Sequence, residues 1–326
     1  MLSRSRQLFG LSSMREWLWM AASEPPETLG RFSTVLSRTF GIRYCRMVSE
    51  FCEIDDGCQR AILVVVAHAD DLTLFLGGTI ARWADAGWRV VALRVTDDRW
   101  DSVGLTEAET ISRNANELQE AAAVLGITEL IDLGYHTDVL GDASEVELRE
   151  RIIRHVRRVK PFALVTFDPY SMYREDNQDH KLVAAATDES FWTSQFDLHH
   201  PEHFADGLSP HGCFERWYFG RRVIDVTDIV DVSDVLDRKI RAALCHTTML
   251  TNIAHQLQLQ AKAGGWRLPI VDEALQSGDL RPVVEVLVRG RSRGQGAGAL
   301  FVEEFRVVRF GGLQRLLDEH GIRDRV

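Results

Sequence analysis

The sequence has few cysteines, no long apolar run and no excess of positive charge. Its five cysteines are an odd number, are widely spread and form no Cys-x-x-Cys pair, which excludes a disulfide framework and favours a reducing compartment. Forty-eight acidic residues outnumber 38 basic ones, giving a net charge of -10. Sequence-independent binding to phosphates requires the opposite sign, so nucleic acid is not expected as a partner.

The apolar residues are also too scattered for a membrane span. No uninterrupted apolar stretch approaches the roughly 20 residues that cross a bilayer. An apolar patch at 8–20 follows two arginines, but Arg15 and Glu16 interrupt it, unlike the apolar region of a signal peptide. We therefore expect a cytoplasmic protein, and the balance of 45% hydrophobic and 26% charged residues is typical of a globular chain.

From residue 60 onward, β-rich runs alternate with helical patterns, which predicts an α/β domain with a mainly parallel sheet. Residues 1–59 are predicted to be an extension that packs on this domain, 60–326, and the segment 190–215 is predicted to be a substrate-side loop. The expected strands are 61–67, 89–96, 129–133 and 162–167, followed by a strand pair at 217–226 and a terminal hairpin at 283–310. The expected helices are 79–86, 107–125, 144–159, 180–189 and 233–259.

Polar side chains follow the first buried strand, where the ligand crevice of an open parallel sheet is expected. His68 and Asp71 are three residues apart in a turn and can converge on one metal ion, while Asp70 can face the open coordination position. Asp179 and His180 follow another strand, so His180 can supply a third ligand. Two nitrogens and one carboxylate oxygen, with a fourth position left to water, are typical of a catalytic zinc site.

Such a metal would lower the pKa of bound water from 15.7 towards about 7, and Asp70 would accept the proton. Zn²⁺ is the expected cofactor, although other divalent ions accept the same nitrogen and oxygen ligands.

Six motifs occur in a fixed order over roughly residues 60 to 310: 67–72 (Ala-His-Ala-Asp-Asp-Leu), 77–79 (Gly-Gly-Thr), 122–126 (Ala-Ala-Val-Leu-Gly), 177–180 (Asn-Gln-Asp-His), Lys239 with Ala242 and His246, and Glu303 with Phe305. In these the chain resembles the PIG-L, or LmbE-like, family of zinc-dependent N-acetylglucosaminyl deacetylases. The resemblance implies a Rossmann-like three-layer sandwich with a small C-terminal β region. It also implies metal ligands His68, Asp71 and His180, with Asp70 as general base, and hydrolysis of an N-acetyl group.

The chain departs from the family pattern at three places. Leu72 stands where the family has Glu, and Asn177 stands where it has a His that acts on the substrate carbonyl or the leaving group. Asn can donate a hydrogen bond but cannot shuttle a proton, which makes acid catalysis more dependent on Asp70. The family's substrate-binding Arg falls at Asn114, and Arg113 is adjacent.

Other candidates have two interpretations each. Asp179 can orient a histidine ring from behind the metal, or act as a helix cap. His246 can face the substrate or be a satisfied core histidine, and Tyr173 can donate to an oxyanion or pack within its loop.

The expected function is metal-dependent N-deacetylation of a small molecule that contains an amino sugar; the long loops suggest a natural-product intermediate. Two alternatives remain open. Leu72 and Asn177 allow a pseudoenzyme or binding protein that kept the metal, and a glycine pair followed by a strand ending at Asp97 allows a nucleotide-binding Rossmann protein. The oligomeric state also stays open, with a homo-oligomer as one option.

Overall fold

The structure, a computed structural model, describes residues 46–48, 60–289 and 300–322. Its strands are β1 (Arg46–Val48), β2 (Ala61–Val66), β3 (Arg89–Thr96), β4 (Glu129–Tyr135), β5 (Ala163–Phe167), β6 (Glu215–Phe219), β7 (Asp228–Asp231) and β8 (Val302–Arg309). Its α-helices are α3 (Asp71–Asp85), α4 (Glu107–Leu125), α5 (Glu145–Val159), α6 (Gln178–Thr193), α7 (Glu202–Ala205), α8 (Leu236–Ala243), α9 (Thr247–Ala263), α10 (Pro269–Ser277), α11 (Arg281–Arg289) and α12 (Gln314–His320). Apart from β1, the predicted extension lies outside the described residues.

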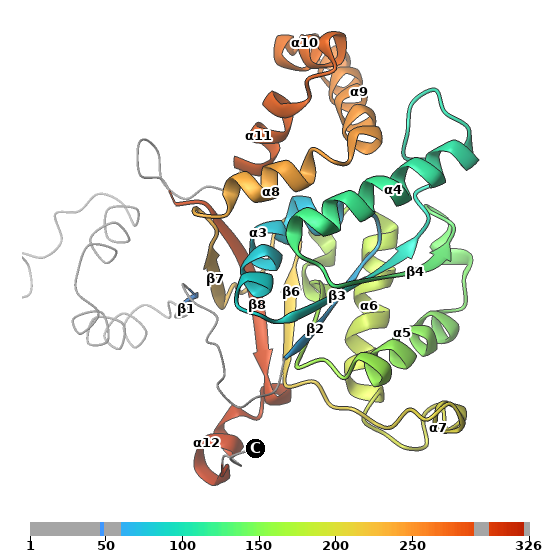
Figure 1. Cartoon of the computed structure of the whole chain (residues 1–326), viewed down its shortest axis with the longest axis vertical. Coiled ribbons are helices and arrows are strands. Elements are labelled where there is room, and N and C mark those ends of the chain that lie inside the picture. Colours follow the sequence, from blue (N-terminus) through green and yellow to red (C-terminus); the bar gives the residue numbers. More distant parts are fainter. Residues whose placement is uncertain (1–45, 49–59, 290–299, 323–326) are drawn as a thin grey trace, which may run out of the picture. The chain divides into compact units, whose positions relative to one another are not determined.

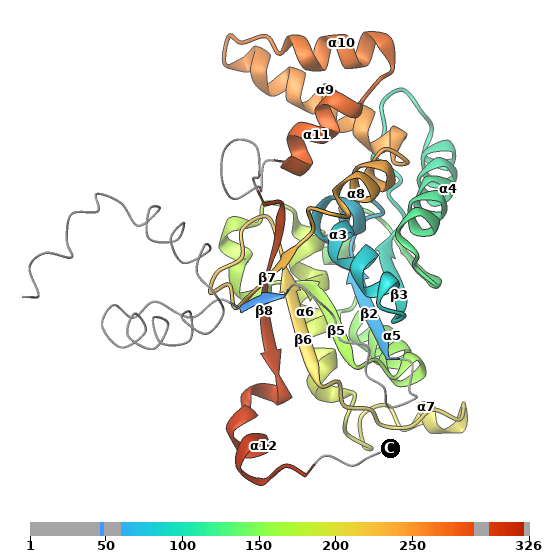
Figure 2. The ribbon, with the colours of Figure 1, turned by 60° about the vertical axis from the view of Figure 1, so that its left-hand side comes forward.

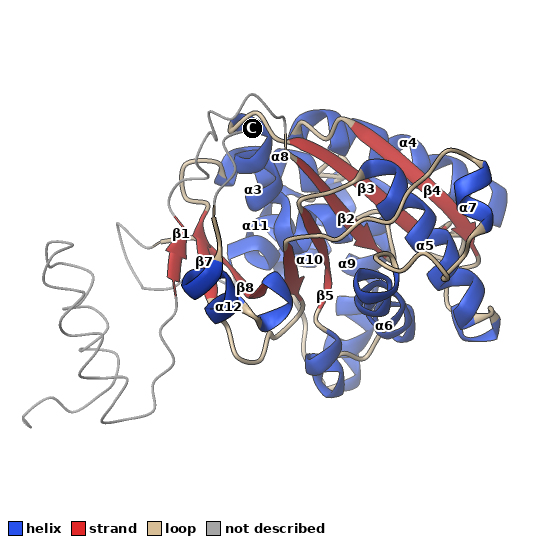
Figure 3. Cartoon of the chain, turned by 90° about the horizontal axis from the view of Figure 1, so that it is seen from below, coloured by secondary structure: helices blue, strands red, loops and turns tan. Residues whose placement is uncertain are grey.

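The described strands form one eight-stranded sheet in the order β1-β7-β8-β6-β5-β2-β3-β4. Figure 3 shows this sheet from β1 at the left to β4 at the right. The strands β6, β5, β2, β3 and β4 run parallel to one another. Strand β8 runs antiparallel to both β6 and β7. The predicted α/β fold with a mainly parallel sheet is therefore confirmed.

Helices cover both faces of the sheet. In Figure 3, α3, α4 and α8 lie on one face and α5 and α6 on the other. The central strand β2 lies between these layers, and all six of its side chains are buried. Its sequence, an unbroken apolar run rather than an alternating one, is typical of a strand covered on both faces. The predicted three-layer arrangement follows from this covering.

A buried carboxylate joins three of these elements. Helix α3 is kinked at Leu76, and the N–H groups of Gly78 and Thr79 donate to the carboxylate of Glu303 on β8 at 2.9 and 2.7 Å. Lys239 on α8 donates to the same carboxylate at 2.6 Å. Because a helix kink leaves backbone donors without their usual partners, Glu303 is needed to satisfy them. These family motifs therefore have a structural role.

This contact also explains why α3 differs from the predicted helix. The sequence predicts a helix that begins at Thr79, after the glycine pair. Instead α3 begins at Asp71 and continues through both glycines. A Cβ at Gly78 would lie 2.6 Å from Val232, so close packing against that side chain requires glycine here.

The predicted hairpin at 283–310 is wrong. Residues 281–289 form helix α11, residues 290–299 lie outside the described part of the chain, and only β8 is a strand. The run of valines suggested a strand, but Val283, Val284 and Val288 are buried together in a small core formed with α8, α9 and α10. Burial on one helical face outweighs the strand preference of valine here.

The single helix predicted over 233–259 is in fact two helices, α8 and α9, which are separated around His246. Figures 1 and 2 show α9, α10 and α11 together beyond the helix layer that contains α8. None of the described helices is long and apolar enough to pass through a membrane.

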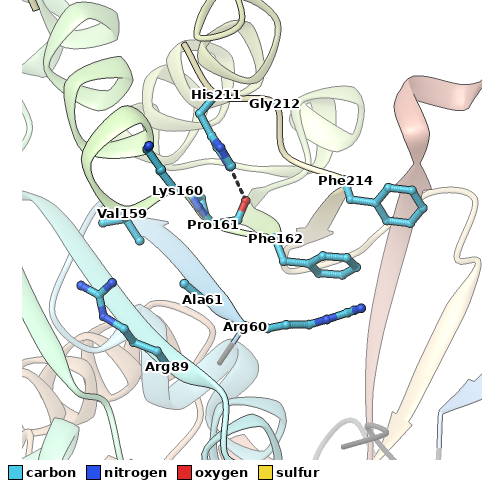
Figure 4. Close-up of a pocket in the computed structure, with 10 residues that line it drawn as sticks. All are labelled: Arg60, Ala61, Arg89, Val159, Lys160, Pro161, Phe162, His211, Gly212 and Phe214. Carbon is cyan, nitrogen blue, oxygen red and sulfur yellow. Dashed lines mark hydrogen bonds between the residues drawn. The ribbon is translucent and has the colours of Figure 1, made fainter. Parts of the chain in front are cut away.

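The segment 190–215 lies at the amino end of the parallel strands. His211 donates to the Pro161 carbonyl at 2.8 Å, and the Phe214 N–H donates to the Phe162 carbonyl, just before β5 begins. A cavity of about 390 Å³ lies at this end (Figure 4). Its lining also includes Arg60, directly before β2, and Arg89, the first residue of β3. Since ligands of such sheets bind at the opposite, carboxyl end, this placement argues against the predicted substrate-side role.

Gly78→Ala should destabilise the fold because the added methyl group overlaps Val232 beside the Glu303 contact. We expect the free energy of unfolding to fall by about 1–3 kcal/mol, measured by denaturant titration. Gly220→Ala is the control, since a Cβ there meets nothing within 4 Å. Equal stability of the two variants would contradict the packing argument.

Candidate metal-binding site

The site lies where two adjacent parallel strands end. His68 comes two residues after β2, and Asp71 is the first residue of α3. His180 is in the first turn of α6, which follows β5 along the chain. Because β2 and β5 are neighbours in the sheet, their carboxyl ends bring the three side chains together although 112 residues separate the histidines. All three are buried.

The three side chains have the spacing of ligands to one ion. His68 Nδ1 lies 3.1 Å from His180 Nε2, and Asp71 oxygens lie 3.3 Å from His180 Nε2 and 3.7 Å from His68 Nδ1. Ligands about 2.0 Å from a tetrahedral zinc ion are about 3.3 Å from one another. The residues therefore fit a zinc ion in both chemistry and spacing. The predicted ligand set is brought together by the fold.

Each histidine has a carboxylate behind it. Asp179 Oδ2 lies 3.5 Å from His68 Nε2 and accepts the Asp138 N–H at 2.7 Å. Glu175 Oε2 lies 3.3 Å from His180 Nδ1. Carboxylates in this position orient the imidazole and make its other nitrogen a better ligand. Sequence reasoning proposed Asp179 but missed Glu175, whose signal was its place in the same polar loop, five residues before His180.

Packing and charge both act on His180. The ring of Phe167 stacks on it with centroids 4.0 Å apart. Burial opposes protonation of His180, but Asp71 and Glu175 outweigh it and raise its pKa to about 9. For His68, burial lowers the pKa and the contact with Asp179 raises it, and the resulting pKa is also above the usual value. The carboxylates thus favour positive charge at this point, which a divalent ion can supply.

Asp70 is the neighbouring acid. It precedes α3 as its N-cap residue, yet its side chain forms no capping hydrogen bond. It is 8% exposed, and burial together with Asp71 raises its pKa to about 7. A bound cation would lower that pKa. Because the Asp70 carboxylate is not used in capping α3, it can exchange a proton with a reacting molecule, as predicted for a general base.

His246 is buried near Asp71, whose charge acts on it. It is 1% exposed, and both ring nitrogens lack a hydrogen-bond partner among the described residues. Burial lowers its pKa to about 4, although Asp71 opposes this change, so the ring is neutral. On α4, Glu117 accepts hydrogen bonds from Thr247 and Thr248 and holds the start of α9, directly after His246. This role of Glu117 was not apparent from the sequence.

The remaining predicted residues differ in placement. Asn177 is the N-cap of α6, and its Oδ1 accepts the His180 N–H at 3.2 Å, so only its amide NH₂ group can act on a substrate. Arg113 is exposed on α4. Tyr173 lies in the 3₁₀ helix Pro169–Arg174, and its side chain is outside the described part. Their functional roles stay predictions.

Two of the departures from the family pattern have structural roles. Leu72 is part of the main hydrophobic core. Asn114 is buried and donates to the Asp98 carbonyl at 3.1 Å, which anchors the loop between β3 and α4.

Another His and Glu cluster, His200, Glu202 and His203, could hold a metal by spacing alone. Its buried member, His203, already contacts Glu150 through Nε2 at 2.6 Å and Arg157 through Nδ1 at 3.2 Å. With both ring nitrogens engaged, this histidine serves the packing of its loop rather than a metal.

The family model for PIG-L, described as GlcNAc-PI de-N-acetylase, matches residues 63–191, which include the three clustered side chains. Residues 63–191 are a PIG-L family domain. The resemblance seen in the sequence motifs is thereby confirmed. The matched range includes β5 and most of β2, whose carboxyl ends carry the candidate site.

Known relatives of the PIG-L domain catalyse more than one reaction. Diacetylchitobiose deacetylase of Thermococcus kodakarensis is 28% identical over 192 residues, covering 57% of this chain and 69% of the relative. 4-Oxalmesaconate hydratase of Pseudomonas putida is 27% identical over 221 residues, covering 63% of this chain and 82% of the relative. The structure of N,N'-diacetylchitobiose deacetylase from Pyrococcus horikoshii has a TM-score of 0.60 at 20% identity, covers 89% of this chain and 95% of that one, and shows the shared fold.

The nucleotide-binding alternative loses its main support. Its glycine pair lies inside α3, whereas the turn after β2 contains His68, Asp70 and Asp71. Nucleotide binders need glycines in that turn so that backbone N–H groups reach the phosphates, and two carboxylates there would repel them.

Glu175→Gln should weaken metal binding because it removes the carboxylate behind His180. We expect roughly 10–100-fold weaker affinity, measured by competition with a chelating dye. Asp176→Asn is the matched control, since this neighbouring acid is 86% exposed and contacts Arg221, as Glu175 also does. Equal losses in both variants would show that general loss of charge, not orientation of His180, is responsible.

Proposed function

We propose that this protein is a zinc-dependent N-deacetylase that removes an acyl group from a small molecule containing an amino sugar. The observation that carries the proposal is the convergence of His68, Asp71 and His180 within ligand spacing, with the Asp70 carboxylate next to them. The family match and the deacetylase relative support the reaction class. The free Cys213 and Cys245 of the described residues suit a cytoplasmic location.

A zinc ion held by His68, Asp71 and His180 would supply Lewis-acid activation of water and of the amide carbonyl. Asp70 would accept the proton of the attacking water as the new C–O bond forms. It would then return that proton to the nitrogen as the C–N bond breaks, so that the amine leaves neutral. Burial raises the pKa of the Asp70 carboxyl and a bound cation lowers it, and these opposed effects suit a group that first accepts a proton and then returns it.

Two further groups can stabilise the oxygen that gains charge. His246 is neutral and has both ring nitrogens free of hydrogen bonds to described residues, so its N–H can donate to that oxygen. The NH₂ group of Asn177 can do the same, because only its Oδ1 is used by the helix cap. Neither group is charged at neutral pH, which leaves Asp70 as the proton carrier.

The charge of the site favours an uncharged substrate. Asp70 and Asp71 are buried acids in its neighbourhood, whereas the buried Asp98 is paired with Arg94. A neutral N-acyl sugar avoids repulsion by these groups, whereas an organic acid anion of the kind that the hydratase name denotes would meet it. The proposal therefore favours deacetylation over hydration.

Asp70→Asn should abolish most activity while preserving the metal, because the residue moves protons and is not a ligand. With N-acetylglucosamine and N,N'-diacetylchitobiose as substrates, we expect kcat/KM to fall roughly 10²–10⁴-fold, followed by assay of released acetate. Zinc content by elemental analysis should stay near one per chain in this variant and be lost in His180→Ala.

Three outcomes are informative. Zinc retained in His180→Ala would contradict the ligand assignment. Full activity of Asp70→Asn would contradict its role as base. Bound zinc without hydrolysis of any N-acyl sugar would favour the pseudoenzyme alternative.

A further inference from the structure

The loop between β3 and α4 contains three aspartates with different surroundings. Asp97 is paired with Arg99, at 3.0 Å from its Nε. Asp98 accepts hydrogen bonds from Arg94 at 2.8 Å and from the Ala69 N–H at 3.1 Å. Both carboxylates thus have partners within the protein.

Asp101 differs from these two. Its Oδ2 is shielded from solvent and has no hydrogen-bond partner among the described residues. One of its carboxylate oxygens lies within 4.8 Å of a ring nitrogen of the metal ligand His68 and of an Asp98 oxygen. A buried carboxylate oxygen without a partner costs stability, which is tolerated where another molecule supplies the donor.

The loop holds Asp101 in place without using its side chain. The Asp101 N–H donates to the Asp98 carbonyl at 3.1 Å, and Asn114 donates to the same carbonyl. On either side, Trp100 donates to Glu107 at 2.9 Å, and Ser102 contacts Thr110 at 2.7 Å. A carboxylate positioned in this way is ready to bind a ligand without further ordering.

We propose that Asp101 is a specificity-determining residue that accepts a hydrogen bond from a substrate hydroxyl next to the scissile amide. This inference rests on the proposed deacetylase function. An oxygen within 4.8 Å of a His68 ring nitrogen would reach substrate atoms that lie a few bonds from the acyl group. In a 2-acetamido sugar, these are the hydroxyl groups on the two carbons that flank the amide-bearing carbon. The preferred substrate is accordingly a vicinal hydroxy-amide and not a simple N-acyl amine.

The test compares Asp101→Ala and Asp101→Asn with the unchanged protein. The substrates are N-acetylglucosamine, its 1-deoxy and 3-deoxy analogues, and N-acetylcyclohexylamine, which has no hydroxyl. We expect Asp101→Ala to lower kcat/KM for N-acetylglucosamine roughly 10–100-fold, mainly through KM, because the hydrogen bond between the substrate hydroxyl and the Asp101 carboxyl group is lost. For one deoxy analogue and for the cyclohexyl amide, the substitution should change kcat/KM less than about twofold.

Asp101→Asn keeps an acceptor oxygen and should recover part of the loss. Asp138→Asn is the matched control: it removes a nearby negative charge from an exposed side chain whose left-handed backbone, φ 62°, suits Asn. Zinc content should stay at the wild-type level in every variant. A uniform loss for all substrates, or the same loss in Asp138→Asn, would overturn the proposal.

A binding measurement separates this inference from the proposed function. Calorimetry of the zinc-loaded protein with glucosamine, the reaction product, should show affinity that falls in Asp101→Ala. Sugar binding and hydrolysis that are unchanged in this variant would overturn the inference and leave the deacetylase proposal intact. If the unchanged protein neither bound nor hydrolysed any of these sugars, both would be overturned.

Discussion

The carboxylate of Glu303 is the contact on which the arrangement of the site depends. It accepts two N–H groups at the kink of α3 and the ammonium group of Lys239 from α8. The same α3 begins at Asp71, and α8 leads to His246. One buried ion pair therefore links β8 to α3, which begins with Asp71, and to α8, which precedes His246. Its geometry matters because a buried charge without its partners is strongly destabilising.

The protein places three carboxylates against the two histidines of the triad. Asp71, Asp179 and Glu175 all lie against the two imidazoles. Without a cation, these acids are balanced by protons on the histidines, and with one they are balanced by the metal. Family membership alone does not decide the reaction, because the relatives include a deacetylase and a hydratase. In the proposed function and the further inference, the reaction and the substrate depend instead on groups around the triad, among them Asp70, Asn177 and Asp101.

Local patterns succeeded where short-range physics dominates. The strand 89–96 and the helix 107–125, with its Gly126 cap, were predicted with the observed bounds. Local patterns failed where contacts between residues distant in the sequence decide the structure. Burial against α8, α9 and α10 turned a valine-rich run into α11, and Glu303 allowed α3 to run through two glycines. A histidine-rich segment looked like a substrate loop, but its hydrogen bonds place it at the amino end of the sheet.

By itself, the sequence determined the α/β class, the carboxyl end of β2 as the place of the candidate site, and His68, Asp71 and His180 as candidate ligands, because these depend on periodicity and on residue chemistry. Tertiary structure alone decided which side chains surround them. Nothing local distinguishes Glu117 and Asp101 from the many solvated acids of the sequence, and the one local signal of Glu175 is its place in the polar loop before His180. Each gained its role from the element opposite it, because burial and the partners it meets are set by how strands and helices pack, not by neighbours along the chain.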